Sequence, residues 1–155
     1  MTVEGTRETG LLCYCRPGFE PELAAELGER AAQAGDAGWA RAERNTGYVQ
    51  FFTPQGHALA QALPLRELIF ARQKLRLLAE LRELDAKDRI TPILAALFER
   101  AAFGDLVVEH PDSDEARPLA GLARSFGNAL RPALRKAGLL TAQPDANLPR
   151  LHVCF

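Results

Sequence analysis

The chain of 155 residues is long enough for one domain or two small ones, and its 47% hydrophobic and 25% charged residues are ordinary for a globular protein. A net charge of −1 excludes a protein that binds nucleic acid through overall basicity, so such a role requires an uneven charge distribution. No apolar run approaches the ~20 residues that a membrane span requires, and we expect a cytoplasmic protein with no membrane partner.

The three cysteines do not form a metal-binding pattern. Cys13 and Cys15 are separated by one residue, and Cys154 lies far from both. There is no C-x-x-C pair and the histidines are dispersed, so we expect no metal site. Buried, reduced thiols are the expected state.

The first half predicts alternating strands and helices. Residues 1–10 are polar and are expected to form a disordered leader. Pro17-Gly18 ends a first strand, Leu23, Leu27 and Ala31 form the apolar stripe of a helix, and Asn45-Thr46-Gly47 joins a hairpin. The predicted strands are 11–16, 39–44, 48–52 and 68–79, and the predicted helices are 20–34 and 57–63. This β-α-β-β-α-β order is typical of a ferredoxin-like fold.

The last of these strands, 68–79, alternates between an apolar and a basic face. Period two places successive side chains on opposite faces of a strand, although segments rich in Leu and Arg also form helices. Gln73 interrupts the apolar face. The expected apolar face holds Ile69, Ala71, Leu75 and Leu77, and the expected basic face holds Phe70, Arg72, Lys74 and Arg76.

The second half predicts an α/β arrangement after a boundary near residues 85–87. Thr91 is expected to cap a helix with Pro92 in its first position, and Asp114 is expected to cap a longer helix with Arg117-Pro118 in its first turn. Gly127-Asn128 and Pro132 leave open whether that longer segment is one helix or two. The predicted strands are 106–109 and 151–155.

Positive charge is concentrated in residues 116–144, which contain no Asp or Glu. On a helical wheel the arginines lie roughly opposite an apolar stripe, which fits either a solvated surface or contact with RNA phosphates and 2′-hydroxyls. An aromatic content of 7% argues against a mode based on stacking of single strands. Arg72 and Arg89 are equally compatible with binding phosphate or with pairing to Glu80, Glu83 or Asp88. The basic residues of 116–144 are Arg117, Arg124, Arg131, Arg135 and Lys136.

The sequence contains no convincing catalytic set. It lacks G-x-G-x-x-G, P-loop, G-x-S-x-G and H-E-x-x-H motifs. The turn at Arg16-Pro17-Gly18 precedes a helix and can in principle hold an anion. A small hydrolase of acylphosphatase type is therefore an alternative, with Asn45 as the candidate amide.

An ordered set of short motifs resembles the N-terminal part of the RlmM family of bacterial 23S rRNA cytidine ribose 2′-O-methyltransferases. The resemblance covers about residues 11–155. The motifs are CRPGFE at 15–20, NTGYV at 45–49, LIFARQ at 68–73, DRITPI at 88–93, LR at 130–131, ALR at 133–135, AG at 137–138 and HV at 152–153.

The resemblance implies an α+β protein in which a ferredoxin-like subdomain, 11–82, precedes a THUMP-type RNA-binding α/β domain, 83–155. It also implies that the S-adenosylmethionine site and the catalytic residues lie in a C-terminal methyltransferase domain beyond Phe155. The chain would then be a truncated form of the protein that is inactive alone. Its expected partners are 23S rRNA and the C-terminal methyltransferase domain of the same protein. Arg72, Arg89, Arg131 and Arg135 match the family motifs, whereas Lys136 does not match securely.

We therefore predict no catalytic residue, no metal site and no cofactor in this chain. A domain-packing module, with its arginines facing another part of a larger protein, is a further alternative. The predicted RNA-binding residues are Arg72, Lys74, Arg76, Arg89, Arg117, Arg124, Arg131, Arg135 and Lys136.

Overall fold

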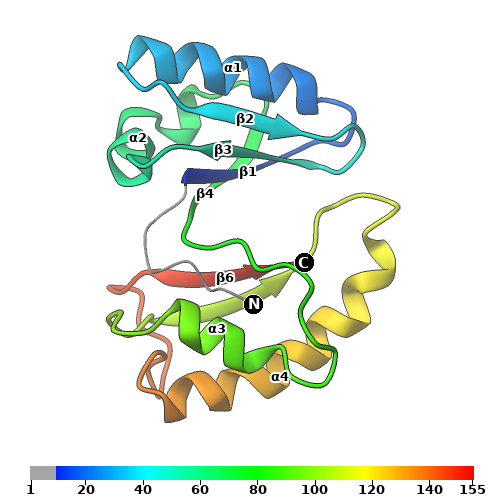
Figure 1. The fold of residues 1–155 in the computed structure, drawn as a ribbon, viewed down its shortest axis with the longest axis vertical. Coiled ribbons are helices and arrows are strands. Elements are labelled where there is room, and N and C mark those ends of the chain that lie inside the picture. The colour runs from blue at the N-terminus through cyan, green and yellow to red at the C-terminus, as the bar shows by residue number, and fades with distance from the viewer. Residues whose placement is uncertain (1–9) are drawn as a thin grey trace. The chain divides into compact units, whose positions relative to one another are not determined.

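A computed structural model describes residues 10–155, which fall into two compact units (Figure 1). The N-terminal unit comprises residues 10–80 together with Pro111–Glu115. The C-terminal unit comprises Leu81–His110 and Ala116–Phe155. The expected leader lies outside the described residues except for Gly10, which begins the first strand. The loop 111–115 groups with the N-terminal unit, a feature that the simple division at residue 82 did not include.

The N-terminal unit is an antiparallel sheet with the strand order β2-β3-β1-β4, and its element order confirms the predicted β-α-β-β-α-β arrangement. Helices α1 and α2 lie on one side of the sheet (Figure 1). A short 3₁₀ turn, Leu65–Glu67, precedes the last strand. The elements are β1 (Gly10–Cys15), α1 (Glu20–Gln33), β2 (Trp39–Ala42), β3 (Tyr48–Phe52), α2 (Gly56–Ala62) and β4 (Ala71–Leu77).

The core of this unit forms because the apolar side chains of the strands and those of α1 face each other. Alternate residues of β1 and β3 point toward the helices, and every third or fourth residue of α1 points back. Each of these side chains is almost completely buried. The shared cluster contains Leu11, Cys13, Cys15, Val49 and Phe51 from the strands, Leu23, Leu27 and Ala31 from α1, and Leu59, Leu63 and Leu68 around α2.

The buried thiols give a first test of this core. Burial raises the pKa of Cys13 to about 12, and burial together with the neighbouring Glu20 carboxyl raises the pKa of Cys15 to about 12. Because the thiolate is the reactive form, both thiols should resist alkylation at neutral pH. We expect iodoacetamide to label only Cys154, which is half-buried, in the native chain and all three cysteines in urea. Mass spectrometry counts the adducts, and rapid native labelling of Cys13 or Cys15 would contradict this core.

Strand β4 corrects two predictions. It begins at Ala71 rather than residue 68, because the backbone N–H groups of Ile69 and Phe70 donate to the Glu26 carboxylate instead of joining the sheet. Leu68 is buried in the core, whereas the side chain of Ile69 is 82% exposed. Ile69 therefore does not belong to an apolar face.

Residues 74–77 of β4 alternate between two faces as expected, but Ala71, which was expected on the face of Leu75 and Leu77, pairs with Cys15 on the face that the helices cover. Lys74 pairs with Cys13 and Arg76 with Leu11, so both basic residues lie on the face that the helices cover. Leu75 and Leu77 lie on the opposite face. The register between β1 and β4 shifts between Tyr14 and Cys15. Because β4 is an edge strand, its long basic side chains can extend past the core toward water.

The C-terminal unit is built around a parallel pair of strands, β5 (Asp105–Glu109) and β6 (Arg150–Cys154), with Leu106 opposite Leu151. A parallel pair requires a crossover, which α4 (Ala120–Lys136) supplies. Gly127 of α4 lies close against Val108, where an added Cβ would be 3.3 Å from its side chain. Helices α3 (Ile90–Ala96) and α4 lie on the same side of the strand pair (Figure 1).

Both helix starts in this unit differ from expectation. The Asp88 carboxylate, not Thr91, caps α3 by accepting the N–H groups of Ile90 and Thr91. The side chain of Thr91, and after it these N–H groups, lower the pKa of Asp88. A 3₁₀ turn, Arg117–Leu119, precedes α4. Helix α4 then runs unbroken through Pro132, which resolves the question of one helix or two. No helix within residues 10–155 is long and apolar enough to cross a membrane.

Candidate functional site

The basic residues of β4 have different surroundings. Lys74 is half-buried and its ammonium group donates to the carbonyl oxygens of Ala60 and Leu63 at the end of α2, while burial lowers its pKa. Arg72 is exposed and pairs with Asp112 at 3.4 Å. Arg76 is exposed. The ammonium group of Lys74 is therefore hydrogen-bonded within the N-terminal unit. Arg72 pairs with a carboxylate other than Glu80, Glu83 or Asp88, the three partners that the sequence suggested.

Helix α4 carries three arginines along one line, which we call the α4 basic stripe: Arg124, Arg131 and Arg135. At 3.6 residues per turn, the three arginines lie within about 40° of one another around the helix axis. They lie about 100° from the centre of the buried face of α4, which is formed by Ala123, Phe126, Gly127, Leu130 and Leu134. The arginines therefore lie beside the buried face of α4. This corrects the prediction from the helical wheel, which placed them roughly opposite it. Lys136 lies on the other flank, and Arg117 lies in the preceding 3₁₀ turn.

Two members of the α4 basic stripe are fixed by backbone carbonyls. Arg131 donates to the carbonyl oxygen of Leu106 at 3.2 Å, and Arg135 donates through Nε to that of Thr141 at 3.3 Å. Arg124 and Arg135 are exposed, and Arg131 is half-buried. A guanidinium has five N–H donors, so one bond to a carbonyl orients the group and leaves donors for an anionic ligand. The stripe thus offers oriented positive charge at the surface.

Arg89 lies directly before α3 and is half-buried. It lies beside Asp88, whose carboxylate caps the helix, so its place in the chain does not separate phosphate binding from ion pairing. Its role stays a prediction, as do those of the other basic residues.

The turn at Arg16-Pro17-Gly18 already holds an anion, which is the side chain of Glu20. The N–H of Gly18 donates to both carboxylate oxygens at 2.8 and 3.1 Å, the N–H of Asn45 donates to Oε1, and the thiol of Cys15 donates to Oε2 at 3.7 Å. Glu20 is completely buried. This internal carboxylate occupies the position that an acyl phosphate would need, so the geometry gives no support to the hydrolase alternative.

A second titratable cluster lies across β5 and β6. The Glu109 carboxylate lies 3.0 Å from Nδ1 of His152 and accepts a hydrogen bond from the Cys154 thiol at 3.4 Å. The imidazole and the thiol thus share one carboxylate oxygen, Oε1 of Glu109. Within residues 10–155 no group of His, Cys, Asp and Glu is arranged to hold a metal ion.

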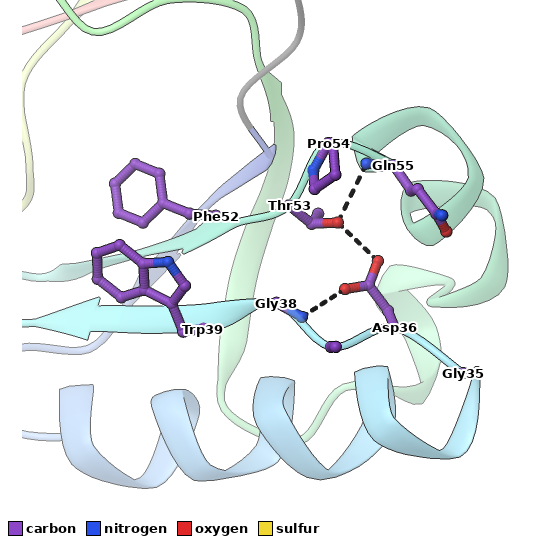
Figure 2. Close-up of a pocket in the computed structure, with 9 residues that line it drawn as sticks. Gly35, Asp36, Gly38, Trp39, Phe52, Thr53, Pro54 and Gln55 are labelled. Atoms are coloured by element: carbon purple, nitrogen blue, oxygen red, sulfur yellow. Dashed lines mark hydrogen bonds between the residues drawn. The ribbon is translucent and has the colours of Figure 1, made fainter.

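A shallow pocket in the N-terminal unit was not anticipated from the sequence (Figure 2). It is lined by residues 35–39 and 52–55, with a volume of about 560 Å³. Its polar groups bond to one another: Asp36 accepts from the Thr53 hydroxyl at 2.8 Å and from the Gly38 N–H at 2.7 Å. At its edge Trp39 packs against Phe52 in a tilted arrangement, with ring centroids 4.7 Å apart, and is 59% exposed.

The described residues do not fit S-adenosylmethionine. Nucleotide-like cofactors of doubly wound folds bind at the carboxyl ends of parallel strands, usually at a glycine-rich turn. In residues 10–155 the named parallel strands are β5 and β6. The loop after β5, His110 to Glu115, contains no glycine and three carboxylates.

Comparisons with known proteins identify both halves of the chain. Residues 9–75 match the model of the RlmM ferredoxin-like domain, and residues 88–155 match that of ribosomal RNA large subunit methyltransferase M, N-terminal. Proteins named ribosomal RNA large subunit methyltransferase M are similar over 147 residues, or 95% of this chain: 71% identical in Xanthomonas campestris pv. campestris strain B100, 70% in Xanthomonas axonopodis pv. citri strain 306 and 69% in Xanthomonas oryzae pv. oryzae strain KACC10331 / KXO85.

The match covers 42% of each of these relatives, so the chain spans about two fifths of their length. The two matched segments follow each other in the chain. The chain therefore belongs to the ribosomal RNA large subunit methyltransferase M family, with its ferredoxin-like domain in residues 9–75 and its N-terminal domain in residues 88–155.

Proposed function

We propose that this chain binds 23S rRNA and serves as the substrate-recognition part of an S-adenosylmethionine-dependent cytidine 2′-O-ribose methyltransferase of the cytoplasm. The name of its relatives supports an rRNA substrate. Recognition is assigned to the THUMP-type C-terminal half, and methyl transfer to a C-terminal methyltransferase domain of the same protein. These 155 residues alone carry out no methyl transfer, since no site in 10–155 fits the cofactor.

The α4 basic stripe is the observation that carries this proposal. Arg131 and Arg135 are oriented by carbonyl oxygens, and Arg124 continues the same line at the surface. Folded RNA presents closely spaced phosphates and 2′-hydroxyls, which rows of oriented guanidinium groups can contact without reading bases. Among the other predicted residues, Lys74 is excluded from the proposed contact set because its ammonium group bonds inside the fold.

The test is salt-dependent binding of folded RNA. We expect the chain to bind fluorescein-labelled fragments of 23S rRNA with an affinity that falls as potassium chloride rises. Replacing Arg124 and Arg135 by glutamate should weaken binding and lower the slope of log affinity against log salt by about 0.7–0.9 for each phosphate that is no longer neutralised. Fluorescence anisotropy measures both quantities.

A matched variant controls for net charge. Arg44→Glu with Arg66→Glu makes the same change in charge at two other exposed positions, and should retain more affinity than the stripe variant. Equal losses in both double variants contradict the assignment to the α4 basic stripe. Absence of binding by the unaltered chain at low salt contradicts the proposed function itself.

A further inference from the structure

An aromatic platform lies on the face of the N-terminal sheet that α1 and α2 do not cover. Trp39 of β2 pairs with Phe52 of β3, and Phe52 pairs with Gly10 of β1, whereas the core residue Phe51 pairs with Leu11. Trp39 and Phe52 therefore point away from the helix-covered core. Their rings are 4.7 Å apart and tilted by 32° (Figure 2).

Arg41 lies against the aromatic platform and is itself held by hydrogen bonds. The guanidinium of Arg41 lies 5.0 Å from the centre of the Phe52 ring, and its Nε donates to the side-chain oxygen of Gln50 at 3.1 Å. Glu80 also accepts from Arg41. Phe52 thus contacts both Trp39 and a held arginine, so the indole is positioned before any ligand arrives.

Trp39 nevertheless keeps most of its surface open to a ligand. Its side chain is 59% exposed at the edge of the pocket in Figure 2, although it lies next to Phe52. Two polar side chains of the pocket wall already have partners, since Asp36 and Thr53 bond to one another and to backbone N–H groups. What the site offers a ligand is therefore a flat aromatic surface.

We propose that Trp39 is a stacking site for one unpaired nucleobase of the RNA, an inference that rests on the proposed RNA-binding function. Nucleobases are planar and can stack on an indole ring. A base inside a duplex is covered on both sides by its neighbours, so only an unpaired base reaches the platform. The N-terminal unit thereby recognises single-stranded RNA, while the α4 basic stripe binds folded RNA through its backbone.

The chain supplies its own reporter for the test, because Trp39 is its single tryptophan. We expect octauridylate to quench the intrinsic fluorescence saturably, and a long blunt-ended RNA duplex, in which only the terminal pairs expose a base face, to quench it far less per nucleotide. In anisotropy measurements Trp39→Ala should weaken binding of labelled octauridylate about 5- to 160-fold, the range that stacking of one base on an aromatic ring contributes. Because stacking carries no charge, this ratio should be the same at low and high salt.

Two further variants separate stacking from disruption of the fold. Trp39→Phe keeps an aromatic ring and should recover most of the affinity, and Phe98→Ala, which removes a 67% exposed aromatic residue of the C-terminal unit, should leave it unchanged. Octauridylate binding without quenching, or equal binding by Trp39→Ala and the unaltered chain, overturns this inference. In either case salt-dependent binding of 23S rRNA fragments would leave the proposed function standing, and loss of all RNA binding would overturn both.

Discussion

Replacing Glu20 by alanine is expected to lower the free energy of unfolding by about 3 kcal/mol, because a completely buried carboxylate would disappear together with the hydrogen bonds that it accepts from two turns. The carboxylate joins the turn after β1 to the β2–β3 hairpin through the N–H groups of Gly18 and Asn45. It is completely buried beside Cys15. Without it, two turns distant in sequence lose their common hydrogen-bond partner.

Urea unfolding followed by Trp39 fluorescence measures this effect, because Trp39 lies in the same unit. Glu22→Ala is the matched control, since Glu22 also lies in the first turn of α1 but is exposed, and it should change stability by less than about 0.5 kcal/mol. Glu20→Gln keeps one carbonyl acceptor and should fall between the two. Equal stability of Glu20→Ala and Glu22→Ala would show that the buried carboxylate does not hold the turns together.

The ferredoxin-like order was predictable because each element carries a strong local signal. In α1 the stripe of Leu23, Leu27 and Ala31 has the helical period, and all three side chains are buried. The hairpin turn follows from Asn45 and Gly47, which both adopt positive φ angles, as the tight connection requires. These features depend only on neighbouring residues, so a sequence without structural information contains them.

The faces of β4 could not be predicted from alternation. Period two states that Lys74 and Leu75 lie on opposite faces but does not state which face the helices cover. Register decides that, since Cys13 opposite Lys74 belongs to the helix-covered core. At an edge strand the ammonium group reaches the carbonyl oxygens at the end of α2, which makes a lysine acceptable on that face.

The two parts of the candidate site were predictable to different degrees. The α4 basic stripe was visible because Arg124, Arg131 and Arg135 recur at seven and four residues, although the carbonyl oxygens that bind two of them come from other segments. The platform of Trp39 and Phe52 was not visible, because the two rings meet only through the pairing of β2 with β3. Composition records few aromatic residues and cannot record that two are adjacent.

Gly104→Ala is expected to lower the free energy of unfolding by about 3 kcal/mol through a backbone clash. A Cβ at this position would lie 2.0 Å from the carbonyl oxygen of Asp145, a separation that no side-chain rotation relieves. Gly104 also donates to the carbonyl oxygen of Pro149 and accepts from the N–H of Asp145, both at 2.9 Å. Relief of the clash therefore breaks bonds that hold the segment before β6 against the start of β5.

Thermal unfolding followed by far-ultraviolet circular dichroism measures the loss, and Gly121→Ala provides the opposite control. Gly121 lies near the start of α4 with open space around its Cβ position, so alanine there should raise stability by about 0.4–1 kcal/mol by reducing the freedom of the unfolded chain. The two substitutions add the same methyl group to the same unit. A similar effect of both on the melting temperature would contradict the close approach of residues 104 and 145, and with it the path of the chain into β6.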